Sequence, residues 1–404
     1  MAEISCLQCS GCGERWSAAG LQTVCSQCGA WLYVRYDLAG LRRTFPSLAA
    51  PPVPLRGMWR YAAVLPGASP VTLGEGFTPL LLSRENPKLL IKNEGLNPGG
   101  SFEARGISLA VTMARGQGWR RLAIASTGSA AAALAAYAAA AGSQADIFMP
   151  RDAPQADRAA CENHGARVTL VEGSIGDCVR LLGERRPAEG WLDLSAFQEP
   201  YGIEGKKTLA YEIAEQMGWS LPKAIVFPAG EGTGLIAMWK GFKEMEELGW
   251  LGPGNPRPRM VAVQAAGCAP IVRAWEQDRA AAEPWTSART IAAGLRVPNP
   301  RASPTVLEVL RQSGGIAVAV SDGEIVDAWR HWARTEGLLA APEGAAALAG
   351  YRKLVSRGFL SAEENTVLVN TGSGFEFIDT IAMENRSKTE PPASRQIGGI
   401  IQPY

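Results

Sequence analysis

The middle of the chain alternates short apolar runs with longer segments of helical periodicity. The apolar runs Leu122–Ala125, Asp146–Met149 and Arg167–Val171 are separated by the helical segments Ala130–Ala141 and Ala153–His164. Such alternation is typical of parallel strands joined by crossover helices, because parallel neighbours cannot be connected by a tight hairpin. It therefore predicts an α/β protein in which helices cover the faces of a parallel sheet.

The same alternation returns in the second half of the chain. The strands expected there are Lys223–Phe227, Met260–Gln264 and Thr366–Val369, and a helix is expected after Gly234. A chain of 404 residues with 47% hydrophobic residues can bury more than one core. We therefore expect two α/β domains with the active cleft between them.

Charge and hydropathy exclude several classes of partner. The net charge is +1 without a basic run, which argues against nucleic acid and anionic membranes. The most apolar helical segment, Ala130–Ala141, is too short to span a bilayer and is interrupted by Tyr137. The first residues do not resemble a secretory signal. We expect a cytoplasmic protein.

Five of the eight cysteines lie within the first 28 residues. Cys9 and Cys12 form one pair and Cys25 and Cys28 another, which is the arrangement of two knuckles around one tetrahedral zinc ion. Cys6 could replace Cys12 as the partner of Cys9, but glycines flank the set Cys9, Cys12, Cys25 and Cys28 and favour it. The alternative is that these are free or disulfide-bonded thiols. A closed site of four cysteines would be structural.

A glycine-rich turn precedes a helix near residue 100. The apolar strand Leu89–Lys92 leads into the turn Asn97–Gly100, and helical periodicity runs from Ile107 to Ala114. Ser101 stands where an N-cap residue is expected. A strand, a glycine turn and a helix start together direct backbone N–H groups at an anion, so this turn is a candidate ligand site.

At this turn the chain resembles threonine synthases, which are pyridoxal-phosphate (PLP) enzymes of fold type II. Their motif reads roughly Asn-Pro-Thr-Gly-Ser-Phe-Lys-Asp-Arg-Gly, and its lysine forms the Schiff base with PLP. The lysine position is Glu103 here and the aspartate position is Ala104. The resemblance extends over nearly the whole chain, including Gly202–Thr208, Val263–Pro270 and Pro342–Ala346.

The resemblance implies a tryptophan synthase β-like architecture of two α/β domains behind an N-terminal zinc ribbon. The expected divisions are a zinc ribbon (1–38), a connector with the start of the large domain (39–102), a small α/β domain (103–205), the large domain (206–385) and a tail (386–404).

The resemblance implies that three loops of this chain contact PLP. Ser126–Ser129 matches a Ser-Thr-Gly-Asn run whose asparagine meets the ring hydroxyl, although the sequence alone is also an ordinary helix start. Gly230–Gly234 matches the loop that holds the phosphate, with Glu231 in place of a glycine. Thr371 and Ser373 match the loop that meets the pyridine nitrogen.

The resemblance places three glutamates in or beside the PLP site: Glu103, Glu231 and Glu376, the last at a lysine position. They indicate an acidic pocket suited to an amine or to acid–base catalysis, with Glu103 and Glu376 as catalytic residues. The alternative is that they turn outward or pair with nearby cations such as Arg105. The ligand-binding residues implied are Ser101, Arg105, Ser126, Thr127, Gly128, Ser129, Gly230, Glu231, Gly232, Thr233, Gly234, Thr371 and Ser373.

Three interpretations of function are open. The first is a PLP-independent enzyme that uses pocket carboxylates on an amino acid or a phosphorylated amino-acid-like substrate. The second is a non-catalytic homologue that binds a ligand or partner. The third is a PLP-dependent lyase with non-covalent PLP or a substitute lysine. The cysteine spacing predicts a structural zinc ion, and the replaced residues predict the absence of PLP and no PLP-dependent threonine synthesis. The expected partners are an amino-acid-like ligand and a second copy in a homodimer.

Overall fold

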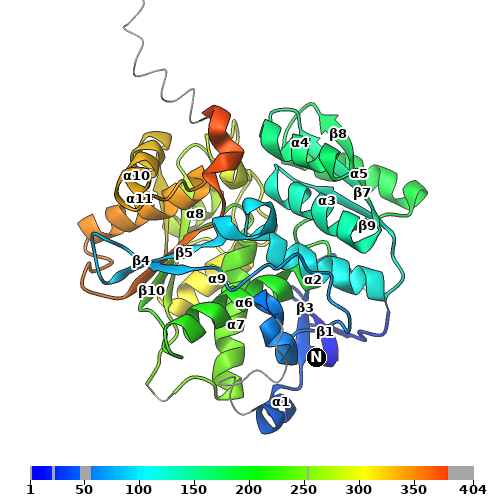
Figure 1. Cartoon of the computed structure of the whole chain (residues 1–404), viewed down its shortest axis with the longest axis horizontal. Coiled ribbons are helices and arrows are strands. Elements are labelled where there is room, and N and C mark those ends of the chain that lie inside the picture. The colour runs from blue at the N-terminus through cyan, green and yellow to red at the C-terminus, as the bar shows by residue number, and fades with distance from the viewer. Residues whose placement is uncertain (1, 21–22, 46–55, 253, 381–404) are drawn as a thin grey trace, which may run out of the picture.

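The computed structural model describes residues 2–20, 23–45, 56–252 and 254–380. Two sheets with helices on their faces form most of this part, and a small third sheet lies at the N-terminus (Figure 1).

The larger sheet has six strands in the order β12-β11-β10-β13-β5-β4. Five strands are parallel, and the edge strand β4 runs antiparallel to β5. Its central strands are buried on both faces, as apolar runs without polar alternation predict. The strands are β4 (Leu80–Leu82), β5 (Leu89–Asn93), β10 (Ala224–Pro228), β11 (Arg259–Ala265), β12 (Ile316–Val320) and β13 (Thr366–Asn370).

The smaller sheet has four parallel strands in the order β8-β7-β6-β9 and forms the lobe at the upper right of Figure 1. Helix α3 packs against it through alanines, whose small side chains allow close approach of helix and sheet. The elements of this lobe are β6 (Arg121–Ala125), α3 (Ser129–Ala141), β7 (Gln144–Pro150), α4 (Gln155–Asn163), β8 (Arg167–Val171), α5 (Ile175–Glu189) and β9 (Leu192–Asp193).

Three long helices lie between the sheets and the N-terminal segment: α2 (Glu103–Gly116), α6 (Tyr201–Gln216) and α7 (Thr233–Leu248). Helices α2 and α6 approach closely because glycines meet where they cross. A Cβ on Gly205 would lie 2.0 Å from the Arg105 carbonyl oxygen, so no larger residue fits there without a shift of the backbone.

The N-terminal sheet has the order β2-β1-β3 and is followed by α1 at the bottom of Figure 1. The Tyr36 hydroxyl donates a 2.7 Å hydrogen bond to Glu204 of α6 and fixes the end of β3 to the central helices. The elements are β1 (Ile4–Cys9), β2 (Arg15–Trp16), β3 (Leu32–Tyr36) and α1 (Leu38–Thr44).

The remaining helices cover the larger sheet. Helix α11 packs on β10 and β13, and α9 packs on β11. Helix α10 begins with a capping box in which Ser321 and Glu324 bond each other's backbone N–H groups. These helices are α8 (Pro270–Glu276), α9 (Ser303–Ser313), α10 (Asp322–Thr335) and α11 (Pro342–Ser356).

The strands and helices expected from the sequence are present, with ends shifted by at most two residues except at α2, which begins four residues before Ile107. One local expectation is wrong: Ser101 is not the N-cap, since α2 begins at Glu103 after Phe102. The Ser101 hydroxyl instead accepts the Glu103 N–H at 3.1 Å. The division into domains stays a prediction, and the tail lies outside the described residues.

None of the helices in the described ranges combines the length and the apolar character that crossing a membrane requires.

Candidate functional site

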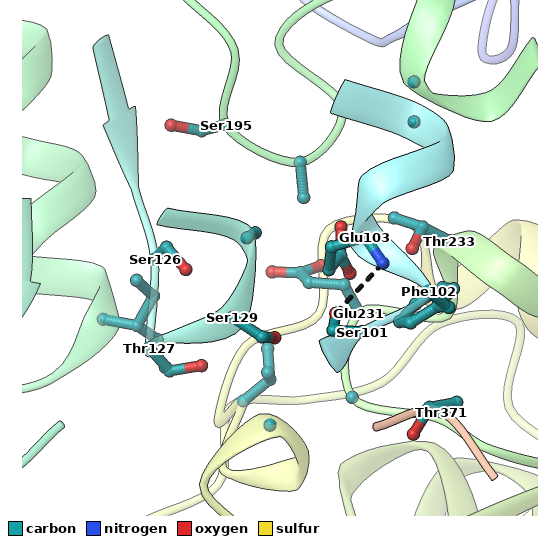
Figure 2. A pocket seen from close by; sticks show the side chains of 18 of the residues that line it. Ser101, Phe102, Glu103, Ser126, Thr127, Ser129, Ser195, Glu231, Thr233 and Thr371 are labelled. Atoms are coloured by element: carbon teal, nitrogen blue, oxygen red, sulfur yellow. Dashed lines mark hydrogen bonds between the residues drawn. The ribbon is translucent and has the colours of Figure 1, made fainter. Parts of the chain in front are cut away.

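A pocket of about 200 Å³ lies where the carboxyl ends of strands from both sheets face each other. In open α/β sheets, ligands bind in crevices at this end of the strands. The pocket is lined by the start of α2, the loop after β6, the loop between β10 and α7, the segment that contains Gly294 and Arg301, and the residues after β13. Figure 2 shows Glu103, Ser129, Glu231 and Thr371 around one space.

An ion pair between Glu103 and Lys206 occupies one wall of this pocket. The Lys206 Nζ lies 2.7 Å from the Glu103 Oε2, and the side chains are only 8% and 18% exposed for Lys206 and Glu103. The same ammonium donates to the Thr233 hydroxyl at 2.9 Å and lies 4.8 Å from the centre of the Phe102 ring. A lysine from α6 therefore reaches the first turn of α2.

Gly106, one turn into α2, makes this reach possible. A Cβ at residue 106 would lie 3.0 Å from the Lys206 Cε and 2.9 Å from the Gly202 carbonyl oxygen. Because residue 106 has no side chain, the lysine can pass over α2 toward Glu103. Glu103 therefore pairs with a nearby cation, as one alternative of the sequence analysis expected, but that cation is Lys206 and not Arg105.

The loop between β10 and α7 presents backbone N–H groups at the start of a 16-residue helix. Such a helix start favours an anion. Glu231 lies in this loop and accepts the Arg301 backbone N–H at 3.2 Å. Burial raises the pKa of Glu231 to about 7, so this carboxyl is only partly ionised at neutral pH.

A second group of carboxyls, which we call the acidic cluster, consists of Asp157 of α4, Glu343 of α11 and Glu376. All three line the pocket. The pKa of Glu376 is raised to about 9 by burial and then by Asp157 and Glu343, and its Oε1 has no hydrogen-bond partner among the described residues. Burial, with Glu343, raises the pKa of Asp157 to about 7. Glu376 is therefore a protonated acid at neutral pH.

The loop after β6 leads directly into helix α3, and one of its residues stabilises the start of that helix. The Ser126 hydroxyl accepts the N–H groups of Gly128 and Ala131 at 3.1 and 3.2 Å. Thr127 and Ser129 line the pocket beside it. The Ser126 hydroxyl therefore stabilises the start of α3, while Thr127 and Ser129 of the same loop are the candidates for ligand binding.

The structure brings most of the expected ligand-binding residues together. Ser101, Ser126, Thr127, Ser129, Gly230, Glu231, Gly232, Thr233 and Thr371 line the pocket. Gly128, Gly234 and Ser373 lie next to lining residues but are not among them. The Ser373 hydroxyl instead accepts the Phe375 N–H at 3.3 Å.

Arg105 is not in the pocket, contrary to the sequence expectation. It is fully buried between Glu94 and Glu212, and its guanidinium bonds the carboxylates of both. Lys92 joins the same network at 2.8 Å from Glu212. Arg105 lies two positions after Glu103 in α2, so its side chain leaves the helix on a different side and points toward α6 instead of the pocket.

Among the ionisable residues that line the pocket, sequence reasoning did not assign five to it: Lys206, Arg301, Asp157, Glu199 and Glu343. Glu199 is buried, accepts the N–H groups of Tyr201 and Gly202, and has its pKa raised by burial to about 7. A sequence signal was available for Lys206, because it lies in Gly202–Thr208, a segment that resembles the family although it is not one of the PLP-contacting loops.

The four cysteines of the expected set do come together. The ligand atoms of Cys9, Cys12, Cys25 and Cys28 all lie within 4.8 Å of one another. The N–H groups of Gly11 and Cys12 donate to the Cys9 Sγ, which is the turn that a knuckle requires. Cys6 lies outside this group, so the glycine-flanked set is the one that the fold gathers.

Most of the chain matches a known family. Residues 71–372 match the family described as pyridoxal-phosphate dependent enzyme. The chain is 36% identical to a threonine synthase of Methanosarcina acetivorans over 91% of each chain. It is 33% identical to a threonine synthase of Methanocaldococcus jannaschii over 95% of each chain.

Solved structures share the architecture. Maize serine racemase superposes with a TM-score of 0.64 at 22% identity, covering 78% of this chain and 94% of its own. A threonine deaminase isoform of Solanum lycopersicum superposes with the same TM-score of 0.64 at 21% identity, covering 76% of this chain and 87% of its own. The expected α/β architecture of fold type II is confirmed.

The expectation that PLP is absent is wrong, because the family match and the threonine synthase relatives point to PLP as the cofactor. That expectation rested on the missing lysine at position 103 and on the charges of three glutamates, and the charges were overestimated. Glu376 and Glu231 have raised pKa values, and Glu103 is paired with Lys206. The pocket is therefore less negative than its composition suggests. The chain belongs to the family of pyridoxal-phosphate-dependent enzymes, and its relatives include threonine synthases.

Proposed function

We propose that this chain is an enzyme of amino-acid metabolism that binds PLP and transforms an amino-acid-like substrate, phosphorylated or not, in this pocket. The observation that carries the proposal is the ion pair between Glu103 and Lys206. It places one carboxylate and one amine in the pocket of a fold whose relatives use PLP.

The pocket residues fit a phosphorylated aldehyde. The backbone of Gly230 and Gly232 leads into α7, whose N-terminus favours the phosphate, and a Cβ on Gly230 would lie 2.2 Å from the Gly294 carbonyl oxygen. Lys206 contributes positive charge next to Thr233. When bound, PLP supplies an electron sink for negative charge developed on the substrate.

Three side chains of this pocket can hold or move a proton. Lys206 holds a proton at its Nζ, and Glu103 can receive it at Oε2 across 2.7 Å. Glu376 is protonated at neutral pH and lines the same pocket. The pocket thus offers a base and an acid, which elimination and addition reactions at adjacent carbons require.

Hydroxyl groups support the choice of an amino-acid-like substrate. Thr127 and Ser129 stand at the start of the 13-residue helix α3 and line the pocket. Hydroxyl groups at a helix N-terminus suit a carboxylate. The carboxyl groups of the acidic cluster line the same pocket, and their oxygens can accept hydrogen bonds from an ammonium group.

The experiment is a binding and turnover assay on the full chain. Purified protein is mixed with PLP, unbound PLP is removed by ultrafiltration, and retained PLP is measured after alkaline release. The loaded protein is then assayed for phosphate and ammonia release from hydroxy-amino acids and their phosphate esters, O-phosphohomoserine included. We expect one PLP per chain and turnover of a member of this set. Failure to retain PLP would overturn the proposal.

A second candidate function is the binding of a cationic amino-acid-like ligand without turnover. The acidic cluster favours it, because a bound cation would lower the pKa values of these three carboxyls and pair with the carboxylates that form. Lys206 and Arg301 are the cations among the described lining residues. Retained PLP with tight ligand binding, but no product from any ester or hydroxy-amino acid, would support this alternative.

We also propose that Cys9, Cys12, Cys25 and Cys28 hold one structural zinc ion. The four sulfurs are close enough for tetrahedral coordination, and no open position is left for catalysis. The support is the geometry of the four side chains.

A further inference from the structure

We infer that the ε-amine of Lys206 is the group that forms a covalent imine with an aldehyde bound in this pocket. It would take the role that the resemblance assigns to a lysine at position 103. The inference rests on the proposed function, since it needs PLP to enter the pocket.

Lys206 is the amine that remains when the other cations near the pocket are excluded. Among the described residues that line the pocket, Lys206 is the only lysine. The other cation there, Arg301, carries a guanidinium that stays protonated and does not form a stable imine. Three other buried lysines are held in ion pairs outside the pocket: Lys92 with Glu212, Lys207 with Glu204 and Glu244, and Lys240 with the same two glutamates.

Position is the second argument. The Lys206 Nζ lies 2.7 Å from the carboxylate of Glu103, so the amine ends next to the tip of the side chain at position 103. It enters from α6 instead of α2, over the space that Gly106 leaves free. The amine is thus supplied from a different helix to the same part of the pocket.

The surroundings of the amine are the third argument. The carboxylate of Glu103 is its neighbour and can accept the proton that makes Lys206 an ammonium. The Thr233 hydroxyl orients the same nitrogen at 2.9 Å. A lysine held at 8% exposure between a carboxylate and a hydroxyl is positioned for one geometry, unlike a lysine on the surface.

Formation of the imine conserves atoms and charge. The Lys206 ammonium gives one proton to Glu103, and the neutral amine adds to the aldehyde carbon. The C–N bond forms as the carbonyl π bond breaks, and the oxygen takes up a proton from the attacking nitrogen. The hydroxyl then leaves as water, with a proton returned from Glu103, and a C=N bond remains. No oxidant or reductant is needed.

Reductive trapping tests the inference. The full chain is incubated with PLP, reduced with sodium borohydride, digested and analysed by mass spectrometry. Reduction converts an imine into a stable secondary amine that marks the lysine. We expect one phosphopyridoxyl group per chain, located on Lys206.

Matched variants sharpen the test. Lys206→Arg keeps the positive charge beside Glu103 but cannot form the imine, so trapping in the pocket should be lost. Lys88→Arg removes an exposed lysine and should leave trapping on Lys206 unchanged. Glu103→Gln keeps the amine and removes the proton acceptor, so trapping should become at least about tenfold slower. Thermal melting checks that each variant is folded.

The possible outcomes separate the two proposals. Retention of one PLP per chain without a label on Lys206, or equal labelling of the pocket in Lys206→Arg, overturns the inference and leaves the proposed function standing. Failure of the unaltered chain to retain PLP overturns both. Labelling of Lys206 that disappears in Lys206→Arg and persists in Lys88→Arg supports the inference.

Discussion

Gly106 of α2 faces Lys206 of α6 across a gap that a methyl group would close, since a Cβ on residue 106 would lie 3.0 Å from the lysine Cε. The Gly202 carbonyl oxygen would be nearer still, at 2.9 Å. The position of the pocket amine therefore depends on the absence of a side chain at one residue.

The variant Gly106→Ala tests this dependence. We expect a loss of about 1–3 kcal/mol of folding free energy, because an added methyl must displace backbone or the lysine in a packed crossing. Urea unfolding measures it. The control is Gly116→Ala at the far end of the same helix, where a Cβ would meet nothing within 4 Å. That change should be neutral or stabilise by up to about 1 kcal/mol, and equal effects of the two would contradict the prediction.

Arg105 gives a second prediction, since it is a structural residue. The variant Arg105→Met leaves the buried carboxylates of Glu94 and Glu212 without their main partner. We expect a loss of about 3–5 kcal/mol in unfolding free energy. The control Arg158→Met breaks a surface pair with Glu162 and should change stability by less than about 1 kcal/mol. An Arg105 variant of normal stability with weakened ligand binding would restore the ligand-binding role.

The raised pKa of Glu376 predicts a pH dependence of stability. The folded chain keeps this proton up to about pH 9, whereas the unfolded chain releases it near its ordinary value of 4.5. Between these values the folded state binds more protons, so its stability falls as pH rises. Glu376→Gln removes this loss.

Melting temperatures at pH 5, 7 and 9 measure the effect. Relative to the unaltered chain, Glu376→Gln should gain a few degrees between pH 5 and pH 9, since each kcal/mol shifts the midpoint by roughly 2 °C in a chain of this size. Glu363→Gln, at an exposed position, should show no such trend. Curves for Glu376→Gln that run parallel to the unaltered chain would refute the assignment.

Metal content gives a fourth prediction. Protein purified without chelator should contain one zinc ion per chain, and Cys28→Ser should lose it because one of four ligands is gone. Cys6→Ser is the matched control, since Cys6 lies in the same sheet but outside the group of four. Elemental analysis decides, and zinc retained by Cys28→Ser or lost by Cys6→Ser would contradict the set.

The sequence predicts the sheets well because their strands are apolar along their length and separated by helical periodicity. The loops after Ala125 and Pro228 were predicted for the same reason, since they follow those strands directly. Lys206 and Asp157 could not be placed in this way. Each reaches the pocket from a helix whose orientation depends on packing, and no local pattern records which side of α4 or α6 faces the cavity.

The charges were misjudged for a related reason. Glu231 and Glu376 read as two negative charges in a sequence, but ionisation depends on burial and on neighbours that only the fold supplies. Arg105 is the opposite case: its charge is certain, and its partners Glu94 and Glu212 lie 11 and 107 residues away.

The crossing of α2 and α6 also affects the folding of the chain. Arg105 and Thr208 bond across it although 103 residues separate them, and the whole four-stranded sheet lies in the chain between. Closing so long a loop carries an entropic cost that local strand and helix contacts do not. The pocket is thus assembled by one long-range closure, and the Glu103–Lys206 ion pair, which joins the same two helices, can form only when that closure is complete.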